Sequence, residues 1–456
     1  MIEDLWYKNN VIYSLDLETF MDANGDGVGD FEGLTRRLDY LHALGIDTVW
    51  LSPFQPSPNR DNGYDISDYY GVDPRHGSSG DFVEFMHQAH KRGIKVIIDL
   101  VVNHTSNQHR WFQSACHNRN SPYYHWYVWS KKRPSDWDEG MVFPGVQKGT
   151  WTYTKGVREY YFHRFYQFQP DLNVDNPEVR REIRRIMGYW LELGVAGFRI
   201  DAVPFIIETP APGKKKPVMK FEYLSEMRKF LQWRSGDAIL LGEANVLPDE
   251  NRRYFGNHED RIHIMFNFFV NQHLFYALAT SDIGPLVEAL EATKDLPPTA
   301  QWVQFLRNHD ELDLGRLTPD QKAEVYARFG PERRMQVYDR GIRRRLAPML
   351  GDRRHRQSLF KCLFCHRRPG VSPECNGICR GAFPRCPKVL GLGYHSRLEG
   401  AIESFSSTRR RYVRAFLLLN GQIRMIGKPS ALGILKCLSK IHRWGRQGGR
   451  RLWCAA

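Results

Sequence analysis

The stretch GFRIDAV, residues 197–203, decides the fold because it has the apolar frame of a buried strand and yet carries two charges. Arg199 and Asp201 stand two residues apart, so on a strand they lie on one face. A buried charge is costly unless an opposite charge matches it or the chemistry of the protein uses it. The stretch therefore predicts an ion pair or a reactive group at the end of a buried strand.

The same local pattern, an amphipathic helix that ends at a glycine and leads directly into an apolar strand, occurs three times in the first 200 residues. Asn176 and Pro177 are typical of the first turn of the third helix. Alternating helices and continuously apolar strands predict a parallel sheet covered by helices. The three units are the helix at 31–44 with the strand at 46–52, the helix ending before Gly93 with the strand at 94–102, and the helix from 177 to 193 with the strand at 195–203.

Four further apolar segments bring the number of predicted strands to seven. They lie at 11–17, 238–244, 262–267 and 302–308. Seven such strands favour a (β/α)8 TIM barrel over a doubly wound sheet, because the first strand is not followed by the glycine fingerprint of a dinucleotide site. Neither strand 8 nor a C-terminal β-domain is recognisable.

The chain is predicted to consist of a barrel with one insertion and an unusual tail. The barrel comprises residues 1–103 and 176–357, and the residues between them, 104–175, form a lid subdomain inserted after strand 3. The lid is rich in Trp, Tyr and His, which suits a flat hydroxylated ligand such as a sugar. Residues 358–456 form a basic, cysteine-rich tail.

The charge of the chain is concentrated in this tail. The chain has 65 basic and 51 acidic residues, a net charge of +14. The tail holds 19 basic and 3 acidic residues, which leaves 46 basic and 48 acidic residues in 1–357. Seven of the 8 cysteines also lie in the tail, so the body has no disulfide framework. The sequence shows neither an apolar run of membrane-spanning length nor a secretory signal, so we expect a cytoplasmic protein without a membrane partner.

Three interpretations of the tail are open. An Asp-free, Arg-rich and Cys-rich composition is typical of a GC-rich gene read in a shifted frame, and this interpretation is favoured. Zinc binding is an alternative, although the spacings match no standard pair of zinc knuckles; its ligands would be Cys362, Cys365, His366, Cys375, Cys379 and Cys386. Nonspecific binding of nucleic acid or an anionic membrane is a third, supported only by charge. We expect no specific nucleic-acid partner.

Polar side chains follow the predicted strands where each strand ends, which is where a barrel of this kind holds its working residues. Each residue alone could be a satisfied core ion pair, a buried hydrogen-bonding histidine or a helix cap. Together they supply a pair of carboxylates, which retaining glycoside hydrolysis needs about 5 Å apart, and Arg199 would keep Asp201 ionised. The residues are Tyr64, Asp65, Asp99, Asn103, His104, Arg199, Asp201, Glu243, Asn308, His309 and Asp310.

Four motifs in order resemble the signature regions of the α-amylase family, glycoside hydrolase family 13. They are DLVVNHTS (99–106), GFRIDAV, GEAN (242–245) and FLRNHDE (305–311), and QPDLN (169–173) resembles a fifth region. The resemblance covers about Trp6 to Gly351. It implies that Asp201 is the nucleophile, Glu243 the acid/base and Asp310 the carboxylate that steadies the distorted sugar. It further implies glucose contacts from Tyr64, Asp65, His104, Arg199 and His309.

Within the family, the segments around these motifs are most similar to the trehalose synthase branch, which isomerises maltose to trehalose. The resemblance implies a small saccharide substrate and a glucosyl intermediate on Asp201. The segment at 206–224 departs from that branch, so an α-glucosidase or amylase stays an alternative. A catalytically inactive remnant is another, because strand 8 is missing. The oligomeric state is open.

Asp22 to Asp30, DANGDGVGD, places oxygen ligands at alternate positions with glycines between them, as Ca²⁺ sites do. The position of the EF-hand glutamate is occupied by Gly33, so a solvated acidic turn is the alternative. The family resemblance implies a structural Ca²⁺ here and no organic cofactor. The expected ligands are Asp22, Asn24, Asp26 and Asp30, with Asn103 and Asp171 at a second family site.

Overall fold

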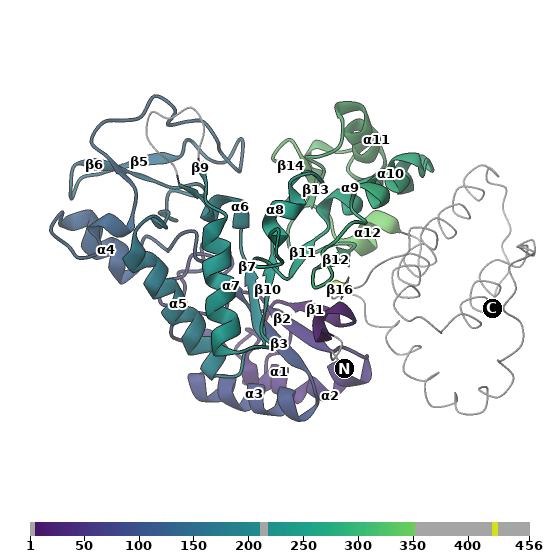
Figure 1. Cartoon of the computed structure of the whole chain (residues 1–456), viewed down its shortest axis with the longest axis horizontal. Helices are drawn as coiled ribbons and strands as arrows, with labels where there is room; N and C mark the ends of the chain where they lie inside the picture. The colour runs from purple at the N-terminus through teal and green to yellow at the C-terminus, as the bar shows by residue number, and fades with distance from the viewer. Residues whose placement is uncertain (1–4, 210–217, 352–421, 427–456) are drawn as a thin grey trace, which may run out of the picture.

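A computed structural model describes residues 5–209, 218–351 and 422–426 (Figure 1). The predicted tail at 358–456 therefore lies outside the described residues except for the short strand at 422–426. All seven strands that the sequence predicts are present and parallel, in a closed barrel with the order β1-β16-β12-β11-β10-β7-β3-β2. The seven are β1 Val11–Leu15, β2 Thr48–Leu51, β3 Lys95–Leu100, β7 Gly197–Ile200, β10 Ile239–Gly242, β11 Ile264–Phe266 and β12 Gln301–Phe305.

The eighth position of the barrel is filled from the tail. Strand β16, Gln422–Ile426, pairs with both β1 and β12, and it runs antiparallel to both. A (β/α)8 barrel has a parallel strand at this position. Backbone N–H and C=O groups at a sheet edge can be satisfied by a strand of either direction, so an antiparallel segment is enough to close the ring. The sequence interpretation did not identify this strand, because Gln422–Ile426 lacks the continuous apolar run and the preceding amphipathic helix that mark the other strands.

Alternate strand residues fill the inside of the barrel. Trp50, Ile97, Leu241, Phe266 and Val303 belong to one buried cluster, and the opposite faces of the strands pack against the helices. Gly197 has φ 152°, and a Cβ there would lie 2.4 Å from the carbonyl oxygen of Ile239 on β10. The strand that carries Arg199 can therefore lie close to β10 only because its first residue is glycine.

The helices begin and end largely where caps and glycines predict. Asn176 accepts a hydrogen bond from Glu178 N (2.9 Å) at the start of α5. The predicted helix at 31–44 is divided at Arg37, where Thr35 bonds back to the Phe31 carbonyl (2.7 Å), a contact that bends helices. The helices are α1 Phe31–Arg36, α2 Leu38–Ala43, α3 Ser79–Lys91, α4 Arg110–His117, α5 Pro177–Glu192, α6 Val203–Ile206, α7 Glu222–Arg234, α8 Asn251–Phe255, α9 Phe268–Thr280, α10 Gly284–Ala292, α11 Pro319–Phe329 and α12 Leu346–Leu350.

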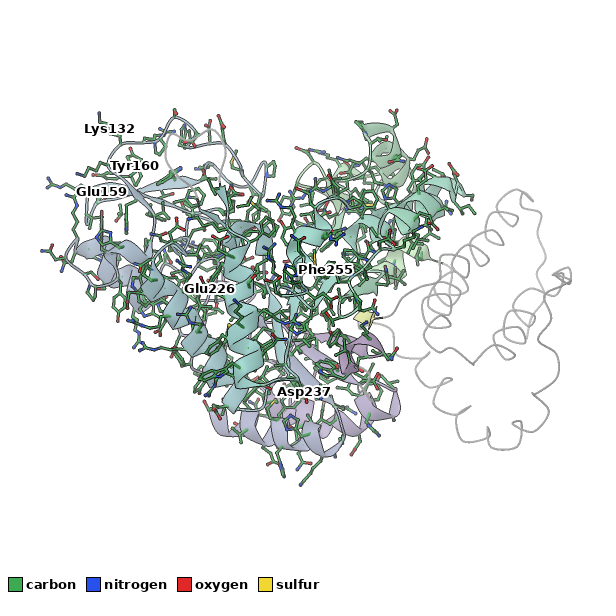
Figure 2. The ribbon with its side chains drawn as sticks, in the orientation of Figure 1. Lys132, Glu159, Tyr160, Glu226, Asp237 and Phe255 are labelled. Atoms are coloured by element: carbon green, nitrogen blue, oxygen red, sulfur yellow. The ribbon has the colours of Figure 1, made fainter. Side chains whose placement is uncertain are left out.

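Neighbouring helices on the outside of the barrel are joined by ion pairs. Glu226 on α7 lies beside α5 (Figure 2) and accepts from Arg180 at 2.8 Å. Both side chains are more than a quarter exposed, so this pair stabilises the packing by less than about 1 kcal/mol. Among the described helices none combines the length and apolar character needed to cross a bilayer.

Two structures rise above the carboxyl ends of the strands, on opposite sides in Figure 1. The predicted insertion at 104–175 contains α4 and a sheet of β4 Trp129–Ser130, β5 Trp151–Thr154 and β6 Glu159–Phe162. The other structure follows β12 and contains a sheet of β13 Leu312–Asp313, β14 Gln336–Val337 and β15 Gly341–Ile342 together with α11. Short hairpin strands β8 Glu208–Thr209 and β9 Val218–Met219 follow β7.

Candidate active site

Arg199 is the centre of a buried group of charges at the carboxyl ends of the strands. Its Nη1 lies 2.5 Å from Asp99 and 2.6 Å from Asp201, and its Nη2 lies 2.6 Å from Glu243. The side chains of Arg199 and Asp99 are 1% and 0% exposed, whereas Asp201 and Glu243 are 11% and 20% exposed. One guanidinium therefore orders three carboxylates, two of which reach toward solvent.

Strand register brings these side chains together. Asp99 on β3 is paired directly with Arg199 on β7, and Leu241 on β10 is paired with Arg199 on the other side. Glu243 follows β10 directly. Its backbone N–H donates to the Ile200 carbonyl (3.2 Å), and its own carbonyl accepts from Val203 N (3.1 Å). The strand-end residues are thus neighbours because their strands are.

The backbone turns sharply next to Asp201. Ala202 has φ 47° and ψ 45°, a left-handed conformation that is uncommon for a residue with a Cβ. Its N–H donates to Glu243 Oε2 at 3.2 Å. The turn follows the end of β7 at Ile200 and orients an N–H toward the Glu243 carboxylate, so one short segment contacts both candidate catalytic groups.

Asp99 and Asp201 both have raised pKa values in this buried group of charges. Burial raises the pKa of Asp201 well above its usual range, and Glu243 and Asp99 add to this, against the opposing charge of Arg199. Burial also raises the pKa of Asp99 to about 6. The expected contact between Arg199 and Asp201 is present, but the expectation that Arg199 alone keeps Asp201 ionised is incomplete. Burial and the neighbouring carboxylates therefore outweigh the charge of Arg199 at Asp201, which binds its proton more tightly than a free aspartate does.

Asp310 joins the same group through Tyr64 and His309. The Tyr64 hydroxyl lies 3.0 Å from His309 Nε2 and donates to Asp99 Oδ2 at 3.3 Å. His309 Nε2 lies 3.3 Å from Asp310 Oδ2, and Asn308 donates to the same oxygen at 3.1 Å. The loop after β12 and the loop after β2 therefore meet above Asp99.

Of the two remaining predicted glucose contacts, His104 bonds to the backbone of Tyr64, whereas Asp65, in the described part of the chain, bonds only within its own loop. His104 Nε2 lies 3.1 Å from the Tyr64 carbonyl, and burial lowers the pKa of His104 to about 4, so its ring is neutral. Asp65 is fully buried and accepts from Ser57 Oγ at 2.8 Å and from the backbone N–H of Asp61 at 3.1 Å. Its carboxylate shapes its own loop, because its hydrogen bonds within the described residues all come from residues 57–61.

Asp61 was missed by the sequence interpretation, although it lies three residues before Tyr64 on the same loop. It accepts a hydrogen bond from Gln169 of the lid at 2.8 Å. Burial raises its pKa to about 6, and the charges of Asp65 and Asp310 contribute. The available signal was an acidic residue in a glycine-containing loop after a strand, a position that fits a polar ligand as well as Asp65 does.

The lid is tied to the structure after β12 by Arg340. Its guanidinium donates to the Val142 carbonyl of the lid at 2.6 Å and lies 3.2 Å from Glu311, the residue next to Asp310. The rings of Phe143 and Tyr338 also meet, with centroids 4.7 Å apart. Segments nearly 200 residues apart are thus joined above the catalytic group.

The predicted calcium loop supplies its own hydrogen bonds. Asp22 accepts from Gly25 N (2.7 Å) and Gly27 N (2.8 Å), and Asp30 caps α1 by accepting from Gly33 N (2.6 Å). Within the described ranges no cluster of three or more His, Cys, Asp or Glu side chains is arranged to hold a metal. A hard cation would therefore rely on Asn24 and backbone carbonyls besides the carboxylates of Asp22 and Asp26.

The second predicted metal set is smaller. The Asp171 carboxylate accepts from the backbone N–H of Arg164 at 2.9 Å, and the side-chain amide of Asn103 lies 3.3 Å from His104 Nδ1. Residues 104 and 171 form an isolated β-bridge within the lid, and the backbone N–H of Leu172 donates to the carbonyl of Asn103 in the barrel at 2.8 Å. One carboxylate and one amide are fewer oxygen ligands than a Ca²⁺ ion usually takes from a protein.

A family model described as the catalytic domain of alpha amylase matches residues 14–329. The chain belongs to the α-amylase family. The matched residues run from β1 to the end of α11 and include Asp201, Glu243 and Asp310. The resemblance inferred from the signature motifs is confirmed.

Relatives of the chain include proteins named as trehalose synthases and as an oligo-1,6-glucosidase. The chain is 45% identical to the trehalose synthase of Thermus thermophilus, over 79% of this chain and 37% of that protein. It is 42% identical to the trehalose synthase/amylase TreS of Mycolicibacterium smegmatis, over 78% and 61%. It is 39% identical to the oligo-1,6-glucosidase of Parageobacillus thermoglucosidasius, over 59% and 50%. The chain therefore spans well under two thirds of the length of these relatives.

Solved structures agree with the family assignment. The trehalose-6-phosphate hydrolase of Bacillus licheniformis superimposes with a TM-score of 0.57 at 32% identity, covering 64% of this chain and 55% of that chain. The isomaltulose synthase SmuA of Protaminobacter rubrum gives a TM-score of 0.61 at 30% identity, covering 69% and 60%.

Proposed function

We propose that the chain is a retaining enzyme of α-glucosidic bonds that isomerises maltose to trehalose. The observation that supports the proposal is the contact of Asp201 and Glu243, at the ends of the neighbouring strands β7 and β10, with the same guanidinium. Similarity to several trehalose synthases supports the choice of substrate. A small saccharide is thus the proposed partner, with no nucleic acid or membrane involved.

The proposed reaction has two displacements. Asp201 attacks the anomeric carbon of the non-reducing glucose, the bond from this carbon to the bridging oxygen breaks, and Glu243 gives its proton to that oxygen. The released glucose then presents its anomeric hydroxyl. Its oxygen attacks the glucosyl ester on Asp201, its proton passes to Glu243, and the ester oxygen leaves. Asp310 would steady the positive charge that develops on the sugar ring in both steps.

Asp201→Asn tests the mechanism. Turnover of maltose should fall by at least a thousandfold, because an amide cannot form the glucosyl ester. Asp39→Asn is the matched control, since that carboxylate is exposed and lies far from the site. The readout is proton NMR of purified chain with maltose, following trehalose and glucose. Full activity of Asp201→Asn would refute the assignment.

Hydrolysis is the alternative fate of the glucosyl ester. Similarity to a relative named trehalose synthase/amylase supports this alternative. Water competes with the retained glucose whenever the lid admits it. The NMR product ratio separates the two. A chain that is soluble and folded but produces neither product would indicate an inactive remnant. The antiparallel eighth strand, which differs from the parallel strand of a complete barrel, is consistent with this alternative.

We further propose a structural Ca²⁺ in the loop at 22–30. Asp22, Asn24 and Asp26 offer oxygen donors at alternate positions, and Gly25 and Gly27 allow the tight turn with φ of 84° and 90°. The ion would stabilise the loop that leads into α1 and would take no part in the chemistry. The set of Asn103 and Asp171 and the cytoplasmic location stay predictions.

A further inference from the structure

Helix α9, Phe268–Thr280, carries buried amide side chains within an otherwise apolar sequence, FFVNQHLFYALAT. Gln272 is fully buried and Asn271 is nearly so, at 0% and 4% exposure. A buried amide without hydrogen bonds costs about 1 to 3 kcal/mol in proteins. These two positions therefore need partners, and the partners are the loops that carry catalytic residues.

Gln272 holds the loop that follows Glu243. Its Nε2 donates to Asn245 Oδ1 at 3.2 Å, and its Oε1 accepts from the backbone N–H of Arg316 at 2.7 Å. Arg316 in turn donates through Nε to the Asn245 carbonyl at 3.1 Å. The three residues form a closed ring of hydrogen bonds around Asn245.

Glu243 is thereby fixed from both sides. On its N-terminal side the backbone bonds to Ile200 and Val203 anchor it to the end of β7. On its C-terminal side Asn245, two residues later, is anchored to α9. Loss of either anchor would let the peptide at 243–245 rotate, and a general acid displaced by about 1 Å can lose about a hundredfold in rate.

The neighbouring amide holds a different catalytic loop. Asn271 Nδ2 donates to the Phe305 carbonyl at 2.6 Å and the Leu306 carbonyl at 3.1 Å. These carbonyls end β12, which leads to His309 and Asp310. Two adjacent side chains on one helix thus reach the Glu243 loop and the Asp310 loop separately.

We propose that Gln272 is a positioning residue for Glu243, acting through Asn245 and Arg316. The proposal rests on the proposed function, since it assigns Glu243 as the general acid. Gln272 touches no reacting atom. It sets where the carboxyl of Glu243 stands relative to the bridging oxygen of the substrate, while Asn271 sets the position of the Asp310 loop.

Gln272→Met tests the proposal, because methionine conserves volume and removes both hydrogen bonds. The comparison is between maltose, whose leaving glucose needs a proton, and α-glucosyl fluoride, whose leaving fluoride does not. The parameter is kcat/KM, which reports the steps up to the first irreversible one. For maltose these steps include proton transfer from Glu243, and for the fluoride they end when fluoride leaves. We expect a fall of 10- to 100-fold for maltose and less than threefold for the fluoride.

Asn271→Leu is the matched control, a buried amide on the same helix that bonds to the other loop. We expect it to lower kcat/KM for both substrates by the same factor, because Asp310 assists both. Gln272→Glu retains the acceptor for Arg316 and loses the donor to Asn245, so it should give an intermediate loss for maltose. If Gln272→Met does not fold, Gln272→Glu alone tests the proposal.

Equal losses for the two substrates in Gln272→Met and Gln272→Glu, or no loss in either, would overturn the proposal. The parent chain is assayed first with both substrates. If it converts neither, the proposed function fails and the role of Gln272 fails with it. If it converts both and the variants show no difference between substrates, only the role of Gln272 fails.

Discussion

Replacement of Arg199 by methionine should destabilise the chain in a pH-dependent way. The substitution removes the only cation that contacts Asp99, Asp201 and Glu243 among the described residues, and the Asp99 side chain is 0% exposed. Breaking a buried ion pair from one side costs about 3 to 5 kcal/mol. A change of 3 kcal/mol shifts the melting temperature by roughly 6 to 12 °C in a domain of 150–250 residues and by less in a larger one.

The sign of the pH dependence follows from the raised pKa of Asp99. Its value of about 6 lies above the ordinary 3.8, so the folded state binds the proton more tightly than the unfolded state does. The associated stability is present below pH 3.8 and is lost as the pH rises through 6. Without Arg199 the pKa values of Asp99 and Asp201 rise further, and the loss continues by up to about 1.4 kcal/mol per pH unit for each carboxyl.

Differential scanning calorimetry of the parent chain and Arg199→Met at pH 8 and pH 5 measures this effect. We expect the gap in melting temperature to be large at pH 8 and less than half as large at pH 5, where Asp99, whose pKa is about 6, is protonated in both proteins. Arg92→Met, which breaks an exposed pair with Asp39, should shift the melting temperature little at either pH. An equal gap at both pH values, or none at pH 8, would refute the reasoning.

Three further predictions concern the lid, the calcium loop and the barrel. Arg340→Gln removes the bond to the lid and should raise the fraction of glucose among the products at least twofold by NMR, because water then reaches the glucosyl ester. Arg334→Gln, at an exposed arginine, is the control and should leave the product ratio unchanged. An unchanged ratio in Arg340→Gln would exclude the lid contact as a barrier to water. Addition of Ca²⁺ should raise the melting temperature of the chelator-treated parent but not of Asp22→Asn, and an equal response would place the ion elsewhere. Gly197→Ala should abolish soluble expression, since its Cβ would clash with β10, and a normal yield would contradict the close approach described there.

The sequence was sufficient for the strands and for much of the catalytic group. A strand alternates its side chains, so Arg199 and Asp201 had to lie on one face, and the helices that end at glycines required parallel strands. Parallel strands place their carboxyl ends together, which predicted that Glu243 and Asp310 would lie near Asp201. These inferences use periodicity over a few residues, which sequence alone contains.

Other parts of the site depended on contacts between distant segments. Asp61 and Asp65 have similar local sequence surroundings, but the fold of their loop directs only Asp61 to the lid, where Gln169 binds it. Gln272 was invisible in the sequence because a polar residue in an apolar helix has no partner until Asn245 is brought beside it. No local pattern distinguishes such a pair.

The sequence by itself determined which residues could carry the chemistry and which strands would hold them. Tertiary structure decided the register that pairs Asp99 with Arg199, the sharing of one guanidinium by three carboxylates, and the closure of the barrel by an antiparallel strand from the tail. Register and closure are set by backbone hydrogen bonds between segments far apart in the chain, and a shift of one residue would turn each side chain to the opposite face. The energies of those bonds depend on the whole barrel and leave no periodic signal in the sequence.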